Sequence, residues 1–253
     1  MHDIPARFLV EGDTALVVDF GEEISPDVFA MVQSLHSTLS SEALLGIVEY
    51  VPTYRSLMII YNPDVVSYKD IESYVRQHWS EDIRPLAEGR VVVIPTCYGG
   101  DFGPDLQELS DMVGLSSEEV VAEHCSSDYL IYMLGFTPGF PYLGGLSARI
   151  ACPRLSSPRT LVPAGSVGIA EQQTGIYPLA TPGGWRIIGR TPVRLFDPAA
   201  DQPFPLQAGD WLRFQPISLD EYTRIESSIA LGEWQPTVLA VSTSAEAAKE
   251  VQQ

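Results

Sequence analysis

The chain has 253 residues, 45% of which are apolar, and its formal net charge at pH 7 is −18. This length accommodates one large domain or two ordinary domains, and the apolar content is sufficient to build a core in either case. Nucleic acids and anionic membranes both bind basic protein surface, so the acidic balance argues against either as a partner.

The sequence gives no signal for membrane insertion or secretion. The longest apolar stretches, 57–61 and 91–94, are far shorter than the roughly 20 residues that a membrane-spanning helix requires. Residues 1–5 lack the basic region and apolar run of a secretory signal, so we expect a cytoplasmic location. The cysteines are widely separated, which favours free thiols and indicates neither a disulfide framework nor a metal site; they are Cys97, Cys125 and Cys152.

The first part of the chain alternates strand-like and helical patterns. Residues 15–20 are an apolar run typical of a strand, and Ser25 followed by Pro26 is a helix-start signal. Apolar residues then recur at helical spacing. We therefore expect an amphipathic helix over 26–40.

Two further strand-like runs, 44–51 and 57–61, are joined by a short turn. Ser67 then opens a second helix, and residues 91–95 supply a last strand. The order strand, helix, strand, strand, helix, strand is the split βαβ, or ferredoxin-like, arrangement. We assign 1–88 to this first domain, because the periodicity is lost near its end.

Two short helices are expected next, near 104–113 and over 117–126. Ser116 and Glu119 have the spacing of a capping box for the second of them.

The composition changes over residues 135–200, which contain 10 of the 20 glycines and 9 of the 20 prolines. Such a density excludes long helices. Strand-like runs between the turn residues indicate a compact β-barrel with elaborate loops; they are 166–170, 185–189, 193–196 and 211–214. We assign 89–217 to the barrel domain, and expect 218–253 to form a helix over 219–229 and a flexible tail after 241.

Basic residues are concentrated in one segment of this acidic chain. Residues 140–200 contain six arginines against Glu171 and Asp197, a local net charge of 6 − 2 = +4. The planar guanidinium of arginine binds carboxylate or phosphate in a bidentate way, so one interpretation is an anionic ligand. The alternative is that these arginines pair with acids elsewhere in the fold. They are Arg149, Arg154, Arg159, Arg186, Arg190 and Arg194.

Self-sufficient catalytic motifs are absent from the sequence. It has no phosphate-binding loop, dinucleotide fingerprint, nucleophile elbow or zinc-protease motif, so any ATP is handled by another route. His124 lies near the C-terminal end of a short predicted helix, where the helix dipole favours a cation, and it precedes turn residues. A functional role is one interpretation of this position; a structural role, which is the more common use of a lone histidine, is the other. No adjacent His or Lys activates Ser166, so we interpret its hydroxyl as a hydrogen-bonding group.

The segment 135–145 combines aromatic rings with glycines and prolines. Such a mixture can form a concave wall, in which rings pack against a ligand and glycine amides make polar contacts. A tightly packed barrel corner is the alternative. The same two interpretations apply to 162–167 and 181–185.

At these residues the sequence resembles the KipI/PxpB family, also called allophanate hydrolase subunit 1. Several uncommon sequence motifs of the family occur in the same order in the second domain. The first domain agrees with the family in length and strand order more than in residue identity. The matching elements are Glu123-His124, Tyr129, Gly135 to Leu143, Pro153-Arg154, Pro158-Arg159, Val162 to Val167, Gln173, Tyr177-Pro178, Pro182 to Trp185 and Ile188 to Pro192.

The resemblance implies an α+β fold in which a ferredoxin-like domain precedes a cyclophilin-like β-barrel. It also implies the B subunit of an ATP-dependent 5-oxoprolinase complex, which opens 5-oxo-L-proline to L-glutamate. The implied partners are a KipA/PxpC-like C subunit and a PxpA-like A subunit that resembles a lactam-utilisation protein, and ATP is expected to be bound by the complex. A small anionic substrate suits the arginine-rich segment.

The resemblance also directs the choice of candidate site residues. His124 and Tyr142 are expected to line a cleft shared with the partner, with His124 as an acid or base. Arg154 or Arg159 is expected to hold the anion. The other substrate-binding candidates are Ser166, Gln173, Tyr177, Trp185 and Arg190.

Two other functions are compatible with the resemblance. The KipI protein was named for inhibiting a sporulation histidine kinase, so a KipI-like inhibitor of a sensor histidine kinase is one alternative. Related domains also form the carboxyltransferase part of urea carboxylase, a role that needs a biotinylated partner. Neighbouring genes for A-like and C-like subunits would favour the oxoprolinase, and a neighbouring biotin carboxylase gene would favour carboxyl transfer.

Overall fold

The computed structural model describes residues 4–42, 44–83, 90–200 and 202–240. The chain divides into two compact units, 1–87 and 88–253. This division lies one residue from the boundary expected after residue 88. Among the described residues, no helix is both long enough and apolar enough to cross a membrane.

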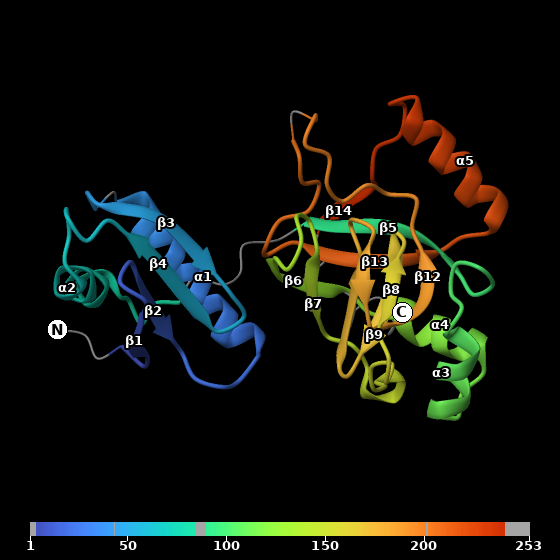
Figure 1. Cartoon of the computed structure of the whole chain (residues 1–253), viewed down its shortest axis with the longest axis horizontal. Coiled ribbons are helices and arrows are strands. Elements are labelled where there is room, and N and C mark those ends of the chain that lie inside the picture. Colours follow the sequence, from blue (N-terminus) through green and yellow to red (C-terminus); the bar gives the residue numbers. More distant parts are fainter. Residues whose placement is uncertain (1–3, 43, 84–89, 201, 241–253) are drawn as a thin grey trace, which may run out of the picture. The chain divides into compact units, whose positions relative to one another are not determined.

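The first unit is a four-stranded antiparallel sheet with two helices packed against it (Figure 1). The strand order is β1-β2-β4-β3. Its elements are β1 (Arg7–Glu11), β2 (Ala15–Asp19), α1 (Pro26–Ser41), β3 (Ile47–Pro52), β4 (Ser56–Tyr61) and α2 (Tyr68–His78). Apolar side chains of the sheet and the two helices form the core, among them Leu16, Leu35, Leu57, Ile59 and Ile71.

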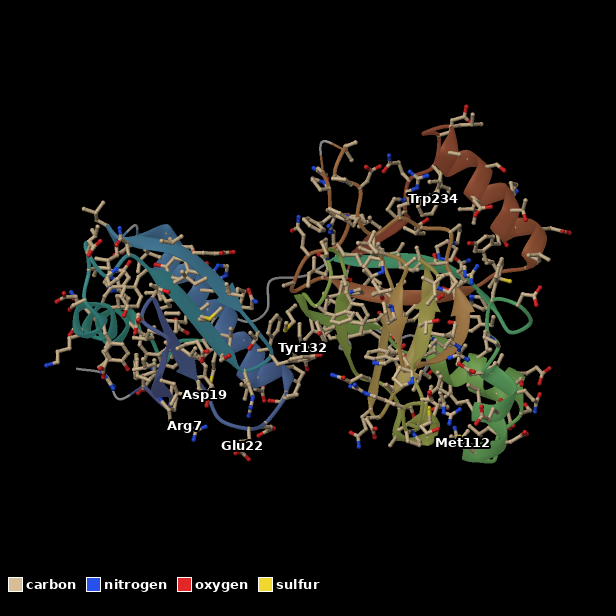
Figure 2. All side chains as sticks on the ribbon, viewed as in Figure 1. Arg7, Asp19, Glu22, Met112, Tyr132 and Trp234 are labelled. Carbon is tan, nitrogen blue, oxygen red and sulfur yellow. The ribbon has the colours of Figure 1, made fainter. Side chains whose placement is uncertain are left out.

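The prediction of 91–95 as the last strand of this domain is wrong. These residues belong to β5 (Arg90–Tyr98), which lies in the second unit. The sheet edge beside β2 is instead occupied by β1, where Arg7 stands opposite Asp19 and forms a 2.6 Å ion pair with it (Figure 2). Most β1 side chains are exposed, so its sequence lacks the buried pattern that marks the other strands.

Both helices of the first unit begin at the residues that the sequence indicates. Ser25 caps α1 and accepts a hydrogen bond from the Val28 amide. Ser67 caps α2, and with Asp70 it forms a complete capping box. Local cap chemistry therefore sets both helix starts.

Replacing Ser67 by alanine is expected to lower the free energy of unfolding of the first unit by about 1 kcal/mol. The Asp70 amide donates to Ser67 Oγ, and alanine leaves this donor without its acceptor. Urea unfolding followed by Trp79 fluorescence measures the change, in a background in which the other three tryptophans are replaced by phenylalanine. Ser67→Gly is the control, because glycine is tolerated at a cap and costs only a few tenths of a kcal/mol. Equal losses for the two variants would contradict the capping role.

The second unit is built around a closed seven-stranded β-barrel (Figure 1). Neighbouring strands follow the order β12-β9-β10-β7-β6-β13-β5, and β5 pairs with β12 to close the barrel. The strands are β5, β6 (Tyr129–Leu134), β7 (Pro141–Gly144), β9 (Ser166–Ala170), β10 (Gln173–Ile176), β12 (Arg186–Arg190) and β13 (Trp211–Pro216), with β14 (Val238–Ala240) added beside β5. The predicted α+β class and barrel are confirmed.

Helices and one β-ribbon surround the barrel. Helix α3 (Leu106–Val113) contacts β12, α4 (Ser117–Cys125) contacts β13, and α5 (Leu219–Ala230) contacts β5. The ribbon pairs β8 (Arg159–Val162) with β11 (Thr181–Gly183), and a short 3-10 helix spans Ala148–Ile150. The capping box predicted for α4 is present, because the Glu119 amide donates to Ser116 Oγ and the Ser116 amide donates to the Glu119 carboxylate.

Two expectations for this unit need correction. Residues 193–196 form no strand. They lie in an irregular segment whose Val193 and Leu195 side chains are buried, and this alternation of apolar residues is the same as that of a strand. The interval 218–253 does not stand apart, since α5 and β14 belong to the second unit. The tail expected after 241 lies outside the described residues.

Candidate functional site

A pocket of about 190 Å³ lies where the β6–β7 loop, strand β10 and the β11–β12 connection meet. Sites for drug-sized ligands measure roughly 300–1,000 Å³, so this one suits a smaller molecule. The lining residues are Phe136, Phe140, Tyr142, Arg154, Gln173, Tyr177, Pro182, Gly183, Gly184 and Trp185. They include five of the predicted site residues, namely Tyr142, Arg154, Gln173, Tyr177 and Trp185.

Aromatic rings form the rigid side of the pocket. Phe140 is 3% exposed, and its ring centroid lies 5.1 Å from Tyr142, 5.7 Å from Tyr177 and 5.6 Å from Trp185. The rings meet edge to face, a geometry that stabilises aromatic pairs. Gly183 permits this packing, because a Cβ there would lie 2.4 Å from the Tyr177 hydroxyl. The predicted aromatic wall is therefore a packed cluster with one face on a pocket.

Arg154 is the cation of the pocket. Four of the six arginines in the basic segment have acidic partners: Arg149 with Glu123, Arg159 with Asp105, Arg186 with Glu108, and Arg194 with Asp197. Within the described residues, no acidic side chain pairs with Arg154. Pairing inside the fold thus accounts for four of these arginines. Of the other two, Arg190 lies over the Phe102 ring, and Arg154 lies in the pocket, where it is able to bind an anion.

The charge of Arg154 also acts on the two phenols of the pocket. Burial raises the pKa of Tyr142, while Arg154 acts in the opposite direction. Burial likewise raises the pKa of Tyr177, opposed by a hydrogen bond from the Trp185 backbone and by the charges of Arg154 and Arg159. Both phenols therefore keep their protons near pH 7 and can donate hydrogen bonds.

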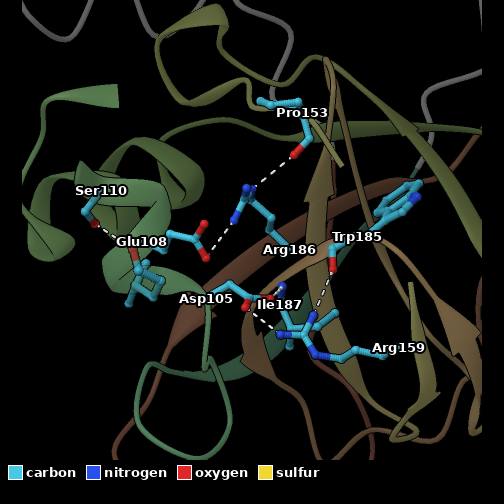
Figure 3. Close-up of polar contacts among 9 residues, drawn as sticks. Asp105, Glu108, Ser110, Pro153, Arg159, Trp185, Arg186 and Ile187 are labelled. Atoms are coloured by element: carbon cyan, nitrogen blue, oxygen red, sulfur yellow. Dashed lines mark hydrogen bonds and ion pairs between the residues drawn. The ribbon is translucent and has the colours of Figure 1, made fainter. Parts of the chain in front are cut away.

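Asp105 holds the segment Trp185–Ile187, the first residue of which lines the pocket (Figure 3). This residue is 4% exposed, and its two carboxylate oxygens have different partners. One accepts a 2.5 Å hydrogen bond from Arg159, and the other accepts a 2.6 Å hydrogen bond from the Ile187 amide. Arg159 also donates to the Trp185 carbonyl at 3.5 Å. A buried acid thus joins the start of α3 to β8 and β12.

Arg186 fixes the backbone next to Arg154 (Figure 3). Its side chain is buried; Nε donates to the Pro153 carbonyl at 3.1 Å, and Nη1 lies 3.0 Å from the Glu108 carboxylate. On the other side of Arg154, the Leu155 amide donates to the Gly184 carbonyl at 2.8 Å. The pocket cation therefore projects from a backbone that is held on both sides.

Sequence reasoning missed the roles of Asp105 and Glu108. Asp105 precedes a helix, where an acid is ordinarily interpreted as a cap, yet its side chain makes no cap hydrogen bond. Its partners lie 54 and 82 residues further along the chain. No local pattern connects positions so far apart, so only the fold reveals the contact.

Three other predicted site residues lie outside the pocket. Arg159 is engaged by Asp105, and Ser166 is fully buried. Arg190 lies over the ring of Phe102, with its guanidinium carbon 4.9 Å from the ring centroid. The structure therefore does not group these three residues with Arg154.

His124 is also outside the pocket, which corrects the expectation that it lines the cleft. It is 0% exposed, with Nδ1 2.8 Å from the Tyr98 hydroxyl and Nε2 2.8 Å from the Thr174 hydroxyl. Thr174 donates its proton to the Gly168 carbonyl, so it must accept one from Nε2. Burial lowers the His124 pKa to about 3. The imidazole is a neutral, fully hydrogen-bonded core group.

The fold and the pocket together define a class of protein. It is a two-unit α+β chain whose barrel presents a small pocket lined by aromatic rings and one arginine. The part of the chain that the structure describes contains no group of three or more His, Cys, Asp or Glu side chains arranged to hold a metal ion. The guanidinium of Arg154 and the phenols of Tyr142 and Tyr177 are hydrogen-bond donors that line this pocket.

Known proteins with the same sequence features identify the family. The model of the family described as carboxyltransferase domain, subdomain C and D, matches residues 6–206. A curated protein of Bacillus subtilis (strain 168), named as the B subunit of 5-oxoprolinase, is 44% identical over 230 residues, which cover 85% of this chain and 95% of that protein. The chain belongs to this carboxyltransferase-domain family, the KipI/PxpB family.

Solved structures share the fold. The protein TTHA0988 is 37% identical with a TM-score of 0.73, over 81% of this chain and 40% of that chain. The urea carboxylase of Kluyveromyces lactis has a TM-score of 0.76 at 20% identity, over 92% of this chain and 24% of that chain. The second likeness is one of fold alone. In both cases the present chain corresponds to one segment of a longer protein.

Proposed function

We propose that the chain is a subunit of an ATP-dependent 5-oxoprolinase and contributes part of an active site that hydrolyses 5-oxo-L-proline to L-glutamate. The observation that carries this proposal is the small aromatic pocket in which Arg154 has no acidic partner among the described residues. The 44% identity to a Bacillus subtilis protein named as the B subunit of 5-oxoprolinase supports it.

Each functional group of 5-oxoproline has a complementary group in the pocket. The carboxylate of 5-oxoproline pairs with the guanidinium of Arg154, which can bind both carboxylate oxygens. Its flat five-membered ring packs against the aromatic wall formed by Phe140, Tyr177 and Trp185. The amide of Gln173 carries both a donor and an acceptor, which complement the N–H and C=O of the lactam.

Tyr142 is the residue that we assign to the reacting amide. Hydrolysis breaks the lactam C–N bond, while water supplies the new carboxylate oxygen and the protons. Negative charge develops on the lactam oxygen during this step, and a protonated phenol can stabilise it. Because burial raises the Tyr142 pKa, the phenol keeps the proton that this role requires.

ATP and the remaining catalytic groups are assigned to the assembly. A pocket of about 190 Å³ is too small for a nucleotide, so the proposal places ATP elsewhere in the complex. ATP would supply a phosphoryl group that is finally released as phosphate alongside ADP, and its hydrolysis would make ring opening favourable. The proposed partners are a KipA/PxpC-like C subunit and a PxpA-like A subunit. The proposed compartment is the cytoplasm, whose reducing conditions suit the three free cysteines.

A carboxyltransferase component is the second candidate, favoured by the description of the matching family. That role requires a biotinylated partner protein and transfer of its carboxyl group. Incubating the chain with a carboxybiotinylated carrier distinguishes the two functions. Loss of the carboxyl group that depends on this chain would support carboxyl transfer, and lactam hydrolysis without biotin would support the oxoprolinase.

Arg154→Ala is expected to lower kcat/KM for 5-oxoproline about 100-fold in the reconstituted complex, because the substrate carboxylate loses its charged hydrogen bonds. Arg154→Lys keeps the charge without the planar fork, and should fall between wild type and alanine. The assay is ATP-dependent formation of glutamate over a range of lactam concentrations.

The matched control is Arg149→Ala, which removes an exposed arginine paired with Glu123 outside the pocket. Its kcat/KM is expected to remain within about twofold of wild type, as for most surface substitutions. Unchanged activity in Arg154→Ala would show that the pocket is not part of the active site.

A further inference from the structure

Phe136 combines a strained backbone with an exposed ring at the pocket. Its φ of 64° lies in the left-handed region, which bulky residues rarely adopt. The Thr137 amide donates to the Gly135 carbonyl at 2.7 Å, so Phe136 is the central residue of a γ-turn of the rare, positive-φ form. Burial does not compensate for this conformation, because Phe136 is 68% exposed.

The loop around Phe136 is fixed on both sides. The Gly135 amide donates to the Phe140 carbonyl, and the Phe140 amide donates to the Thr137 carbonyl, each at 3.1 Å. Gly139 has a φ of 83° and packs so tightly that a Cβ would lie 2.6 Å from the Leu195 carbonyl oxygen. The Phe136 ring contacts Phe140 edge to face at 5.7 Å. The strained turn therefore holds one ring at the rim of the pocket.

Arg154 alone cannot distinguish the substrate of the proposed reaction from its product. Both 5-oxoproline and glutamate carry the α-carboxylate that Arg154 would bind. They differ in the remaining atoms: the substrate has a flat uncharged ring, whereas the product has an ammonium group on its α-carbon and a second carboxylate at the far end of the chain. A group that contacts the ring face is needed to tell them apart.

We propose that Phe136 is this specificity-determining residue: it packs on the ring of the bound lactam and favours the cyclic substrate over the open-chain product. The proposal rests on the proposed function. An aromatic ring covers an uncharged ring favourably, whereas covering the charged groups of glutamate removes their water without supplying a partner. The strained turn presents the ring in advance, so little conformational freedom is lost on binding.

The test uses the reconstituted complex, with the KM for 5-oxoproline and the inhibition constant of glutamate as readouts. Phe136→Ala is expected to raise the KM about tenfold and to leave the glutamate constant within about twofold. Phe136→Leu retains apolar bulk and should raise the KM by a smaller factor. Leu161→Ala is the matched control, because Leu161 is 61% exposed and does not line the pocket.

An unchanged KM in Phe136→Ala, or equal changes in both constants, would overturn the inference. Arg154→Ala separates this failure from failure of the proposed function. If Arg154→Ala raises both constants while Phe136→Ala raises neither, only the role of Phe136 is lost. If the wild-type complex forms no glutamate from 5-oxoproline, both proposals fall.

The strain itself has a separate readout in the chain alone. Phe136→Gly and Phe136→Ala both remove the ring, but glycine adopts a positive φ at no steric cost. The glycine variant is therefore expected to melt at a higher temperature than the alanine variant. If it melts no higher, the turn is not strained and the ring is not held in advance.

Discussion

Lowering the pH from 7 to 5 is expected to decrease the free energy of unfolding of the second unit by about 2 kcal/mol through His124 alone. Burial lowers the pKa of this histidine from 6.5 to about 3. Between these values the unfolded chain binds a proton at His124 and the folded chain does not. The stabilising contribution is therefore present above pH 6.5 and is lost as the pH falls toward 3.

The hydrogen bonds of His124 give the structural reason. The Nε2 proton is donated to Thr174, and Nδ1 accepts from the Tyr98 hydroxyl. A second proton on the ring would leave two donors, Nδ1 and Tyr98, facing each other. The ring also packs against Phe214, with centroids 4.4 Å apart, in the barrel core. A charge there has neither water nor an acidic partner.

Urea unfolding at pH 7, 6 and 5 tests this prediction in a Trp79→Phe background, in which every remaining tryptophan belongs to the second unit. His124→Gln cannot titrate and should lose about 2 kcal/mol less than the parent between pH 7 and 5. His36→Gln is the control, since burial also lowers the His36 pKa but His36 lies in the first unit. Equal pH slopes for the parent and His124→Gln would contradict the prediction.

The parts of the fold that follow from local chemistry could be predicted from the sequence. Ser67 and Ser116 specify helix starts through hydrogen bonds within three residues, so these boundaries agree. The apolar run of β5 is equally compatible with the last strand of the first sheet and with the first strand of the barrel. Only its pairing with β12 and β13 shows that it belongs to the barrel. Strands such as β11, with three residues, are too short to show a period.

The candidate site likewise has features that were expected from the sequence and features that were not. The resemblance directed attention to Arg154 and Arg159, and the structure places Arg154, but not Arg159, with the aromatic rings at one pocket. Arginine chemistry alone does not distinguish Arg154 from the other arginines of the segment, because all six carry the same group. The burial of His124 was not predicted, although a clue was present. Val120 and His124 are four residues apart on α4 and are both buried, so one helix face carries both into the core. The position of a histidine at a helix end does not reveal which way it faces.

Asp105→Ala is expected to lower the free energy of unfolding of the second unit by about 3 kcal/mol. The variant leaves the Ile187 amide without its acceptor and Arg159 without its acidic partner. Arg159 keeps some access to water, with 31% of its side chain exposed, so the loss should fall at the lower end of the range for buried pairs. Asp101→Ala, at a nearby exposed acid, is expected to change stability by less than about 0.5 kcal/mol.

A double-mutant cycle with Arg159→Ala separates the ion pair from the rest of the loss. The two single variants and the double variant should give a coupling energy of about 1.5–3 kcal/mol, and a value below about 0.5 kcal/mol would show that the pair is not energetically coupled. Asp105 also holds Ile187, two residues from the pocket residue Trp185. We therefore expect Asp105→Ala to raise the KM for 5-oxoproline as well, and Asp105→Asn, which keeps an acceptor for Ile187, to raise it less.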